Sequence, residues 1–212
     1  DDYGRAYHTS DPYFEGETPQ WYRLTFDELG RVLTKTLPDN SQIKITYNGL
    51  TTTTQNPLQQ NDIRKVNQRG LLIESTDKNG KKVTYVYNSS GNLLETHDPK
   101  GNVITMEYDL LGNRTKLIDP DLGTVTSTYN AFGELVTELD SKPNAQAVVT
   151  TYDEIGRVKT RTEAEGVTTW TYDTQPKGIG KLSSVSGLNG ISQSYEFDEL
   201  GRLKHQSETI DG

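Results

Sequence analysis

Residues 152–158 read Tyr152-Asp153-Glu154-Ile155-Gly156-Arg157-Val158, and nearly the same seven residues stand at 26–32 and 197–203. The shared pattern is an aromatic residue, Asp or Asn, two variable residues and Gly. It also occurs at 87–91, 108–112 and 129–133. The glycines at positions 70, 91, 112 and 133 are each 21 residues apart. A fixed period of about 20 to 50 residues indicates a repeat architecture. The sequence therefore predicts an array of small units.

Degenerate copies of the motif fill the gaps between the clear ones. They are Tyr47-Asn48-Gly49, Val66-Asn67-Gln68-Arg69-Gly70, and Tyr172-Asp173 followed late by Gly178 and Gly180. The start, Asp1-Asp2-Tyr3-Gly4-Arg5, resembles a motif without its aromatic residue, and Ile210-Asp211-Gly212 resembles a turn within a copy. We expect one array of about nine or ten repeats over residues 1–212. Because both ends fall inside a copy, we also expect a fragment of a larger protein.

Each copy predicts two short strands and two turns. Before the motif, apolar and polar residues alternate, as in Ile43-Lys44-Ile45-Thr46-Tyr47, which is typical of a half-buried strand. Asp-x-x-Gly then favours a tight hairpin, because Asp bonds to its own backbone and Gly adopts the positive φ of a bulge. Second strands are expected at 31–35 and 92–96. They end in turns that contain Pro or Gly, at 38–40, 78–80, 98–101, 119–123, 165–166 and 188–190.

The predicted fold class is all-β, with repetitive antiparallel β-hairpins that form a curved or spiral sheet. Hydrophobic residues make up only 31% of the chain and the mean hydropathy is -0.76. This composition disfavours a globule with one large apolar core. A sheet one layer thick needs only a stripe of Tyr, Ile, Val and Leu, and the abundant Thr suits a wetted face. Neighbouring copies are expected to support one another.

Charge and cysteine content exclude several functional classes. The net charge of -8 and the pI of about 4.9 have the wrong sign for a protein that binds nucleic acid or an anionic membrane. Without cysteine the chain forms no disulfide, no thiolate zinc site and no cysteine nucleophile. No apolar run is long enough to span a membrane as a helix, so we expect no membrane insertion by this segment.

The repeated motif closely resembles the bacterial Rhs or YD repeat, over essentially the whole chain. The residues that carry the resemblance are Phe26–Val32, Tyr108–Asn113, Tyr152–Val158 and Phe197–Leu203, with the intervening Asp98-Pro99-Lys100-Gly101-Asn102 turn. The family implies a strand-rich spiral wound into a hollow β-shell. In bacterial polymorphic toxins and insecticidal toxin complexes this shell encloses a toxic C-terminal segment, and related repeats form the barrel of teneurins. The family's self-cleaving aspartate site is not recognisable in this sequence.

The candidate binding residues all have simpler structural interpretations. The arginines after the motif glycine, Arg5, Arg31, Arg157 and Arg202, could recognise a carboxylate or a sugar. We expect them instead to lie over a neighbouring ring or to pair with a motif Asp. The acidic turn with Asp119 and Asp121 could hold calcium, but it lacks both the EF-hand spacing and the glycine-rich nonapeptide. We therefore expect no metal site.

Catalytic and glycan-binding signals are weak. His8, His97 and His205 are far apart, and neither a zinc-binding His-Glu-x-x-His nor a Gly-x-Ser-x-Gly elbow is present. We expect no catalytic residues, no cofactor and no enzyme activity, although a pair of carboxylates across the fold remains an alternative. Trp21 is the better candidate for an exposed, sugar-binding ring, whereas Trp170 shares a strand face with Tyr172. The sequons at Asn88 and Asn113 overlap the hairpin motif.

The resemblance implies a structural, non-enzymatic wall segment of a secreted or cell-surface bacterial protein. Its expected partners are the remainder of the parent Rhs protein and the enclosed toxin polypeptide. The alternative is an extracellular adhesion module that binds glycans.

Overall fold

The computed structural model describes residues 3–210, and in this range the fold is all-β, as predicted. Nineteen strands follow one another, and the single helix is a short 3₁₀ turn at Leu188–Gly190. Contacts group the chain into two compact units, and the division falls between Val103 and Ile104 in the sequence. No helix of the described residues has the length and apolar character needed to cross a membrane. The motif at residues 1–5 and the turn at residues 210–212 each extend beyond the described residues.

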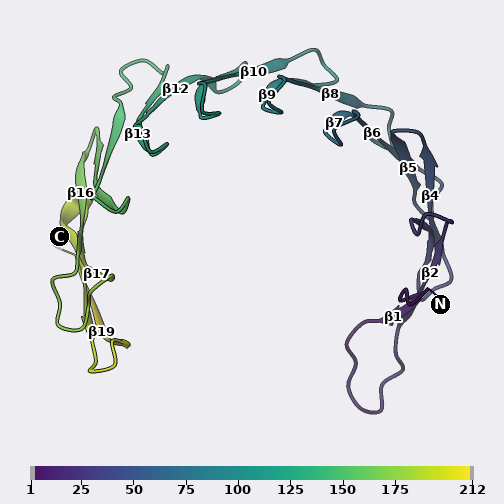
Figure 1. Ribbon diagram of the computed structural model, residues 1–212, viewed down its shortest axis with the longest axis horizontal. Helices are drawn as coiled ribbons and strands as arrows, with labels where there is room; N and C mark the ends of the chain where they lie inside the picture. Colours follow the sequence, from purple (N-terminus) through teal and green to yellow (C-terminus); the bar gives the residue numbers. More distant parts are fainter. Residues whose placement is uncertain (1–2, 211–212) are drawn as a thin grey trace. The chain divides into compact units, whose positions relative to one another are not determined.

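The first unit contains nine strands, drawn in purple to teal in Figure 1. They are β1 (His8–Ser10), β2 (Trp21–Phe26), β3 (Val32–Thr36), β4 (Gln42–Asn48), β5 (Thr51–Gln55), β6 (Asn61–Val66), β7 (Leu72–Thr76), β8 (Lys82–Tyr87) and β9 (Leu93–His97). Each strand pairs antiparallel with the next one in sequence. The expected strands at 31–35 and 92–96 thus exist, each displaced by one residue.

The second unit contains the remaining ten strands and has the same antiparallel order. They are β10 (Val103–Tyr108), β11 (Arg114–Asp119), β12 (Gly123–Tyr129), β13 (Leu135–Asp140), β14 (Val148–Tyr152), β15 (Val158–Glu163), β16 (Gly166–Tyr172), β17 (Leu182–Ser186), β18 (Ile191–Phe197) and β19 (Leu203–Ile210). Consecutive strands again pair with one another. The strip is therefore a succession of hairpins, and each hairpin is supported by its neighbours.

In each unit the turns alternate between the two long margins of the strip. The motif turns, at residues 27–31, 48–51, 67–71, 88–92, 109–113, 130–134, 153–157, 173–181 and 198–202, lie on one margin of their unit, which we call the motif margin. The other turns lie on the opposite margin of their unit, which we call the second margin; they are at residues 11–20, 37–41, 56–60, 77–81, 98–102, 120–122, 141–147, 164–165 and 187–190. In eight motif hairpins the register shifts at the motif aromatic or at its substitute Val66, which is the bulge expected beside a positive-φ glycine.

The two faces of the sheet differ in chemistry. One face, which we call the tyrosine face, carries the motif aromatics with Ile, Val and Leu neighbours, such as Ile43, Ile45 and Tyr47 on β4, all half-buried. The opposite face, which we call the hydroxyl face, is rich in Thr and Ser. Cross-strand hydroxyl pairs occur on it at Thr25–Thr34 (2.5 Å), Thr128–Thr137 (2.6 Å) and Thr151–Thr160 (2.6 Å). This division follows from the period of two along each strand.

The described residues contain no buried apolar core. No hydrophobic side chain among them is buried, and Ser183 is the one side chain that solvent does not reach at all. A single layer of strands has no second layer to cover it. Because no second layer has to be packed against the sheet, the fold needs few hydrophobic residues, which agrees with the low hydrophobic content of the chain.

Candidate functional site

The motif turn is held by its Asp or Asn side chain. In the first clear copy, Asp27 Oδ1 accepts the backbone N–H of Leu29 (3.0 Å) and of Arg31 (2.8 Å). Two backbone hydrogen bonds also close this turn: the N–H of Asp27 donates to the Arg31 carbonyl, and the N–H of Gly30 donates to the Asp27 carbonyl. Gly30 has a φ of 78°, the left-handed conformation that glycine adopts without strain. The predicted role of the Asp-x-x-Gly sequence is confirmed.

The same carboxylate or amide cradle recurs along both margins. Motif-margin copies are Asn67, Asn88, Asp109, Asn130, Asp153 and Asp198, and second-margin copies are Asn56, Asp77 and Asp98. In each copy one oxygen accepts the N–H groups two and four residues later. Asp and Asn are interchangeable here because both offer the same acceptor oxygen.

A cation after one motif turn reaches the aromatic ring of the next copy. The guanidinium carbon of Arg31 lies 4.1 Å from the centroid of the Tyr47 ring, and Arg157 lies 4.2 Å from that of Tyr172. Arg5 over Phe26 (4.5 Å) and Lys181 over Phe197 (4.7 Å) repeat the arrangement. The expectation that the motif arginines lie over a neighbouring ring or pair with a motif Asp is met at all four positions: Arg5, Arg31 and Arg157 lie over a ring, and Arg202 pairs with Asp198.

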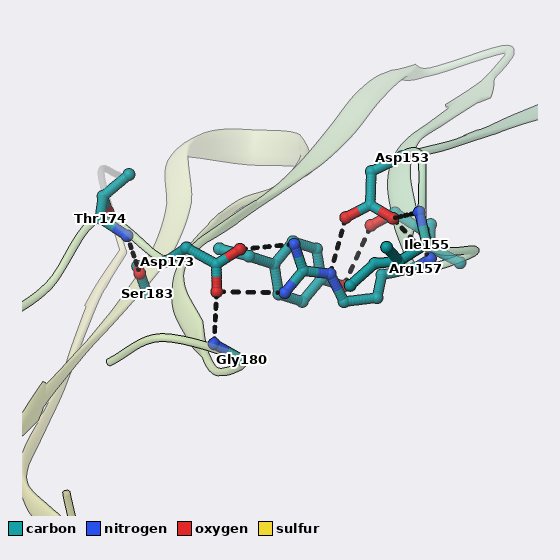
Figure 2. A network of polar contacts seen from close by, with 9 residues as sticks. Asp153, Ile155, Arg157, Asp173, Thr174, Gly180 and Ser183 are labelled. Atoms are coloured by element: carbon teal, nitrogen blue, oxygen red, sulfur yellow. Dashed lines mark hydrogen bonds and ion pairs between the residues drawn. The ribbon is translucent and has the colours of Figure 1, made fainter. Parts of the chain in front are cut away.

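Arg157 makes the most extensive of these connections (Figure 2). Its Nε donates to Asp153 Oδ2 in its own turn at 2.6 Å. Its two Nη atoms donate to Asp173 in the next motif turn, at 3.2 Å and 2.6 Å. Asp173 also accepts the N–H of Gly180 at 2.6 Å. One planar guanidinium thus ties two turns and one ring together, a use that suits arginine better than lysine.

Arg202 differs from Arg157, although the seven residues around it are nearly the same. It pairs with Asp198 of its own turn at 2.8 Å, and its side chain is 73% exposed. The contrast identifies the contact with the following repeat as the feature that orders an arginine of this motif.

The motif tyrosines bind the preceding hairpin through their hydroxyl groups. Tyr152 donates to the carbonyl of Leu135 (2.9 Å) and Tyr172 to that of Val158 (3.0 Å). The hydroxyls of Tyr47, Tyr87 and Tyr129 likewise donate to the carbonyls of Val32, Leu72 and Arg114. Each acceptor is the first residue of the strand that follows the previous motif glycine. Aromatic, hydroxyl and cation therefore form one ladder that joins successive hairpins.

The ladder lowers the pKa of its carboxylates. Partial desolvation raises the pKa of Asp153, but the hydrogen bonds from the backbone and guanidinium of Arg157 outweigh it, and the net pKa lies below the usual value. The side-chain hydrogen bond from Arg157 and the N–H of Gly180 lower the pKa of Asp173. In turn, these two carboxylates raise the pKa of Arg157. All three groups are charged at neutral pH.

The remaining candidate residues serve the turns and strands. Asp119 Oδ1 accepts the N–H groups of Asp121 and Leu122, so this carboxylate is part of its turn. His97 bonds to Glu95 at 2.7 Å, and His8 bonds to Arg23 at 3.0 Å. Among residues 3–210, no three His, Asp or Glu side chains gather in a way that could hold a metal ion. In the part of the chain that the structure describes, the three histidines do not come together.

The tryptophans and sequons behave as the sequence suggests. Trp21 is 50% exposed, with the His8 ring centroid 5.7 Å from its own, whereas Trp170 is half-buried on the tyrosine face. Asn88 Oδ1 accepts two backbone N–H groups in its turn, and Asn113 Nδ2 donates to Asp109. Both sequon asparagines are thus accounted for by the hairpin.

Two features of the structure were not predicted from the sequence: the cross-strand hydroxyl pairs and the exposed apolar residues at the tips of the motif turns. The cross-strand hydroxyl pairs depend on the register between strands, which the spacing of the motif does not give. The exposed apolar residues at the tips of the motif turns, such as Phe132 and Ile155, were visible in the sequence as the residue before the motif glycine. An apolar residue that recurs within a polar turn is the signal that could have identified them.

The geometry defines a class of protein: an array of β-hairpins in which an Asp-x-x-Gly turn, a tyrosine and a cation link each copy to the next. Within this class the chain contains Rhs repeats, since the family described as RHS Repeat matches residues 67–103 and 87–122. The motif continues on both sides of these residues, so the rest of the chain resembles a structural segment built from such repeats. No curated protein matches the chain by sequence.

Solved structures with the same fold come from Tc toxin assemblies. The TcdB2-TccC3-Cdc42 crystal structure matches 100% of this chain with a TM-score of 0.65 and 14% identity. TcdB2-TccC3 also matches 100% of it, with a TM-score of 0.56 and 15% identity. The Photorhabdus luminescens Tc holotoxin pore matches 99% of it, with a TM-score of 0.58 and 14% identity. In all three cases the chain spans only 16% of the length of the similar chain.

Proposed function

We propose that the chain is a non-enzymatic piece of the wall of a hollow β-shell, which encloses a toxin polypeptide inside a large secreted bacterial Rhs-type protein. Its direct partners are then the remainder of the parent chain and the enclosed polypeptide. The chain as a single array of about nine or ten repeats, cut from that longer protein, is part of this proposal.

One observation carries the proposal. The fold of the whole chain matches a stretch of the TcdB2-TccC3-Cdc42 structure, with a TM-score of 0.65, yet the chain amounts to 16% of that longer chain. A piece of this relative size suits a section of a wall better than a complete binding module. The match is one of fold, so the role in encapsulation is inferred from the family resemblance and from the physical chemistry of the strip.

The chemistry of the two faces supports a wall. A hydroxyl-rich face offers hydrogen bonds without an apolar surface on which an enclosed chain could collapse and fold. The ladder on the tyrosine face holds neighbouring hairpins together without a core, so the strip can be extended by adding copies. A wall needs both properties.

The chemistry of the carboxylates supports a non-enzymatic role. The motif aspartates, including Asp27, Asp153 and Asp198, use their oxygens for the N–H groups of their own turns and for the following arginine. Their pKa values are lowered, whereas a general acid needs a raised one.

The experiment is a two-face accessibility test in the parent protein. Arg161 and Thr162 are neighbours on β15, are both exposed and, by strand alternation, lie on opposite faces. Because the chain has no cysteine, Arg161→Cys and Thr162→Cys each introduce one unique thiol, in a parent freed of any other cysteine. A bulky polymer-linked maleimide then reports which face is enclosed.

We expect both thiols to react in the isolated chain and one of the two to be protected in the parent, by at least about tenfold in rate. Proteinase K digestion of the same parent should leave the enclosed segment intact, whereas that segment is degraded when it is expressed alone. Equal labelling of both faces in the parent, with cleavage of the inner segment at the rate of the free one, would exclude a closed wall.

A glycan-binding module is a second candidate, favoured by one observation. The half-exposed Trp21 borders a hollow of about 350 Å³ that is also lined by His8, Tyr22 and Asn40. Aromatic rings with polar neighbours are suited to sugars. A glycan array probed with the chain and with Trp21→Ala tests it: binding that the substitution abolishes supports the module, and an array without signal removes it.

A further inference from the structure

Five consecutive motif turns of the second unit end in an exposed apolar side chain. Each of these residues stands immediately before a glycine with positive φ: Leu111 (74% exposed), Phe132 (89%), Ile155 (73%), Ile179 (86%) and Leu200 (76%). We call these five residues the tip row. They lie on the motif margin, because each belongs to a motif turn. Solvent reaches most of the surface of every one.

The turn geometry does not require an apolar residue at this position. The residue before the positive-φ glycine is Arg69 or Ser90 in two motif turns of the first unit, and Asn79 or Lys100 in second-margin turns of the same form. Those turns have the same Asp or Asn cradle. The conformation of the turns therefore does not explain the apolar tip row, and the row is a feature of the protein surface that needs another explanation. A recurring row of exposed apolar side chains that the turns do not require indicates a candidate interaction site.

The distance between successive tips determines which kind of partner fits the tip row. Strands lie about 4.8 Å apart, so tips that recur once per hairpin are about 9.6 Å apart. An extended peptide presents side chains on one face every ~6.8 Å, which does not match. A helix presents them every ~10.5 Å at i and i+7, which drifts by about 4 Å over five tips. A second tip row has the same pitch and can interdigitate along its whole length.

The space between two tips can receive such a side chain. An open hollow of about 620 Å³ lies between the turns of Phe132 and Ile155, and Val136 and Tyr152 also line it. Its rim includes Glu134 and Glu154, and Glu199 stands beside Leu200. Two facing rows would thus bring apolar groups together and acidic groups near one another.

We propose that the tip row is a self-complementary interface, through which the motif margin of one chain docks on the motif margin of a second copy. This inference does not rest on the proposed wall function, because it uses only the surface of residues 104–210. Five side chains and the turn atoms around them bury on the order of 600 Å² per copy, somewhat less than a standard interface. We therefore expect a weak dimer, with a Kd in the micromolar to millimolar range. Salt should strengthen it by screening the acidic rims.

The test is sedimentation equilibrium of the full chain from about 10 μM to about 1 mM, at low and at high salt. We expect a dimer whose Kd rises at least tenfold in the double variant Phe132→Ser, Ile155→Ser. The matched control is Leu58→Ser, Leu122→Ser, which removes two exposed leucines of the second margin. The control should leave the Kd within about twofold. Circular dichroism and thermal melting confirm that both variants are folded.

Cysteine cross-linking separates the tip row from the free edge strand β19, whose residues are all exposed. Because the chain has no native cysteine, Phe132→Cys and Thr209→Cys place one thiol on the tip row or on the edge. Rapid disulfide formation between copies through Phe132→Cys, and slow formation through Thr209→Cys, is expected. A chain that stays monomeric throughout the range, or a dimer that survives loss of the tips and cross-links through Thr209→Cys, overturns the proposal.

Discussion

Arg157 Nη2 lies 2.6 Å from Asp173 Oδ2, so a side chain that begins beside one motif glycine ends on the turn of the next repeat. The same guanidinium lies over the Tyr172 ring and bonds to Asp153. Its side chain is 24% exposed, which is far less than that of Arg202. Such a contact holds two hairpins in a fixed relation although neither has a core.

Replacing Arg157 should destabilise the fold more than replacing Arg202. Arg157→Gln removes the bonds to two turns and the contact with one ring, whereas Arg202→Gln removes a pairing within one turn. We expect the Tm to fall by about 2–4 °C for Arg157→Gln and by less than about 1 °C for Arg202→Gln. Differential scanning calorimetry measures both values, and equal shifts would mean that the connection between repeats carries no stability.

The tyrosine hydroxyls should contribute separately from their rings. Tyr152→Phe keeps the ring but removes the hydrogen bond to the Leu135 carbonyl, and we expect a loss of about 1 kcal/mol in the free energy of unfolding. The control is Tyr108→Phe, because the Tyr108 hydroxyl meets only the sulfur of Met106 at 3.7 Å, a weak acceptor. Urea unfolding followed by circular dichroism distinguishes them. A loss in Tyr108→Phe as large as that in Tyr152→Phe would contradict this account.

The motif glycines should tolerate asparagine better than β-branched residues. Gly133 has a φ of 79°, and a Cβ there would meet only Asn113 Oδ1 at 3.6 Å, so backbone conformation alone decides the effect. We expect Gly133→Val to cost about 1–2 kcal/mol or more, and Gly133→Asn clearly less, because Asn adopts the left-handed region more readily. Thermal unfolding of the two variants is the measurement. Equal losses would point to packing instead of φ.

Acid should weaken the fold through its turn carboxylates. The side-chain hydrogen bond from Asn113 lowers the pKa of Asp109, and the backbone N–H of Lys81 lowers that of Asp77. A carboxyl with a lower pKa in the folded state binds its proton more readily when unfolded. Its contribution is therefore fully present above the unfolded pKa near 3.8 and is lost as the pH falls through the folded value.

Asparagine at these turns provides the matched control for acid sensitivity. Asn67, Asn88 and Asn130 already make the same cradle without a titratable group. In the variant Asp77→Asn, Asp109→Asn, the free energy of unfolding should depend less steeply on pH below about pH 4. Unfolding curves between about pH 2 and about pH 7 test this. An unchanged pH dependence would exclude these two carboxylates as its source.

The sequence predicts the local structure well because each local device is encoded within a few residues. Alternation of Ile43, Ile45 and Tyr47 predicts the face that they share, and Asp27 with Gly30 predicts the turn and its bulge. The degenerate copy at Val66 still forms its hairpin and bulge, since the turn depends on Asn67 and Gly70 and not on the aromatic ring.

The contacts between repeats were predictable only in kind. The sequence predicts that a motif arginine meets a ring or an acid, but not that Arg157 reaches Asp173 while Arg202 stays within its turn. Asp173 stands in the motif turn that follows Arg157, whereas no described motif turn follows Arg202. A cross-strand pair such as Thr151–Thr160 depends on register, which a bulge shifts by one residue.

The strict pairing of each strand with its successor has a consequence for how the chain acquires its structure. The bonds that join repeats span short stretches of sequence: 16 residues from Arg157 to Asp173, 17 from Leu135 to Tyr152 and 20 from Lys181 to Gly201. Low contact order favours rapid folding, and a chain emerging from a ribosome or a secretion channel exposes its residues in order. Each hairpin thus finds its partners soon after it emerges, and the growing strip can assemble vectorially, from one end to the other.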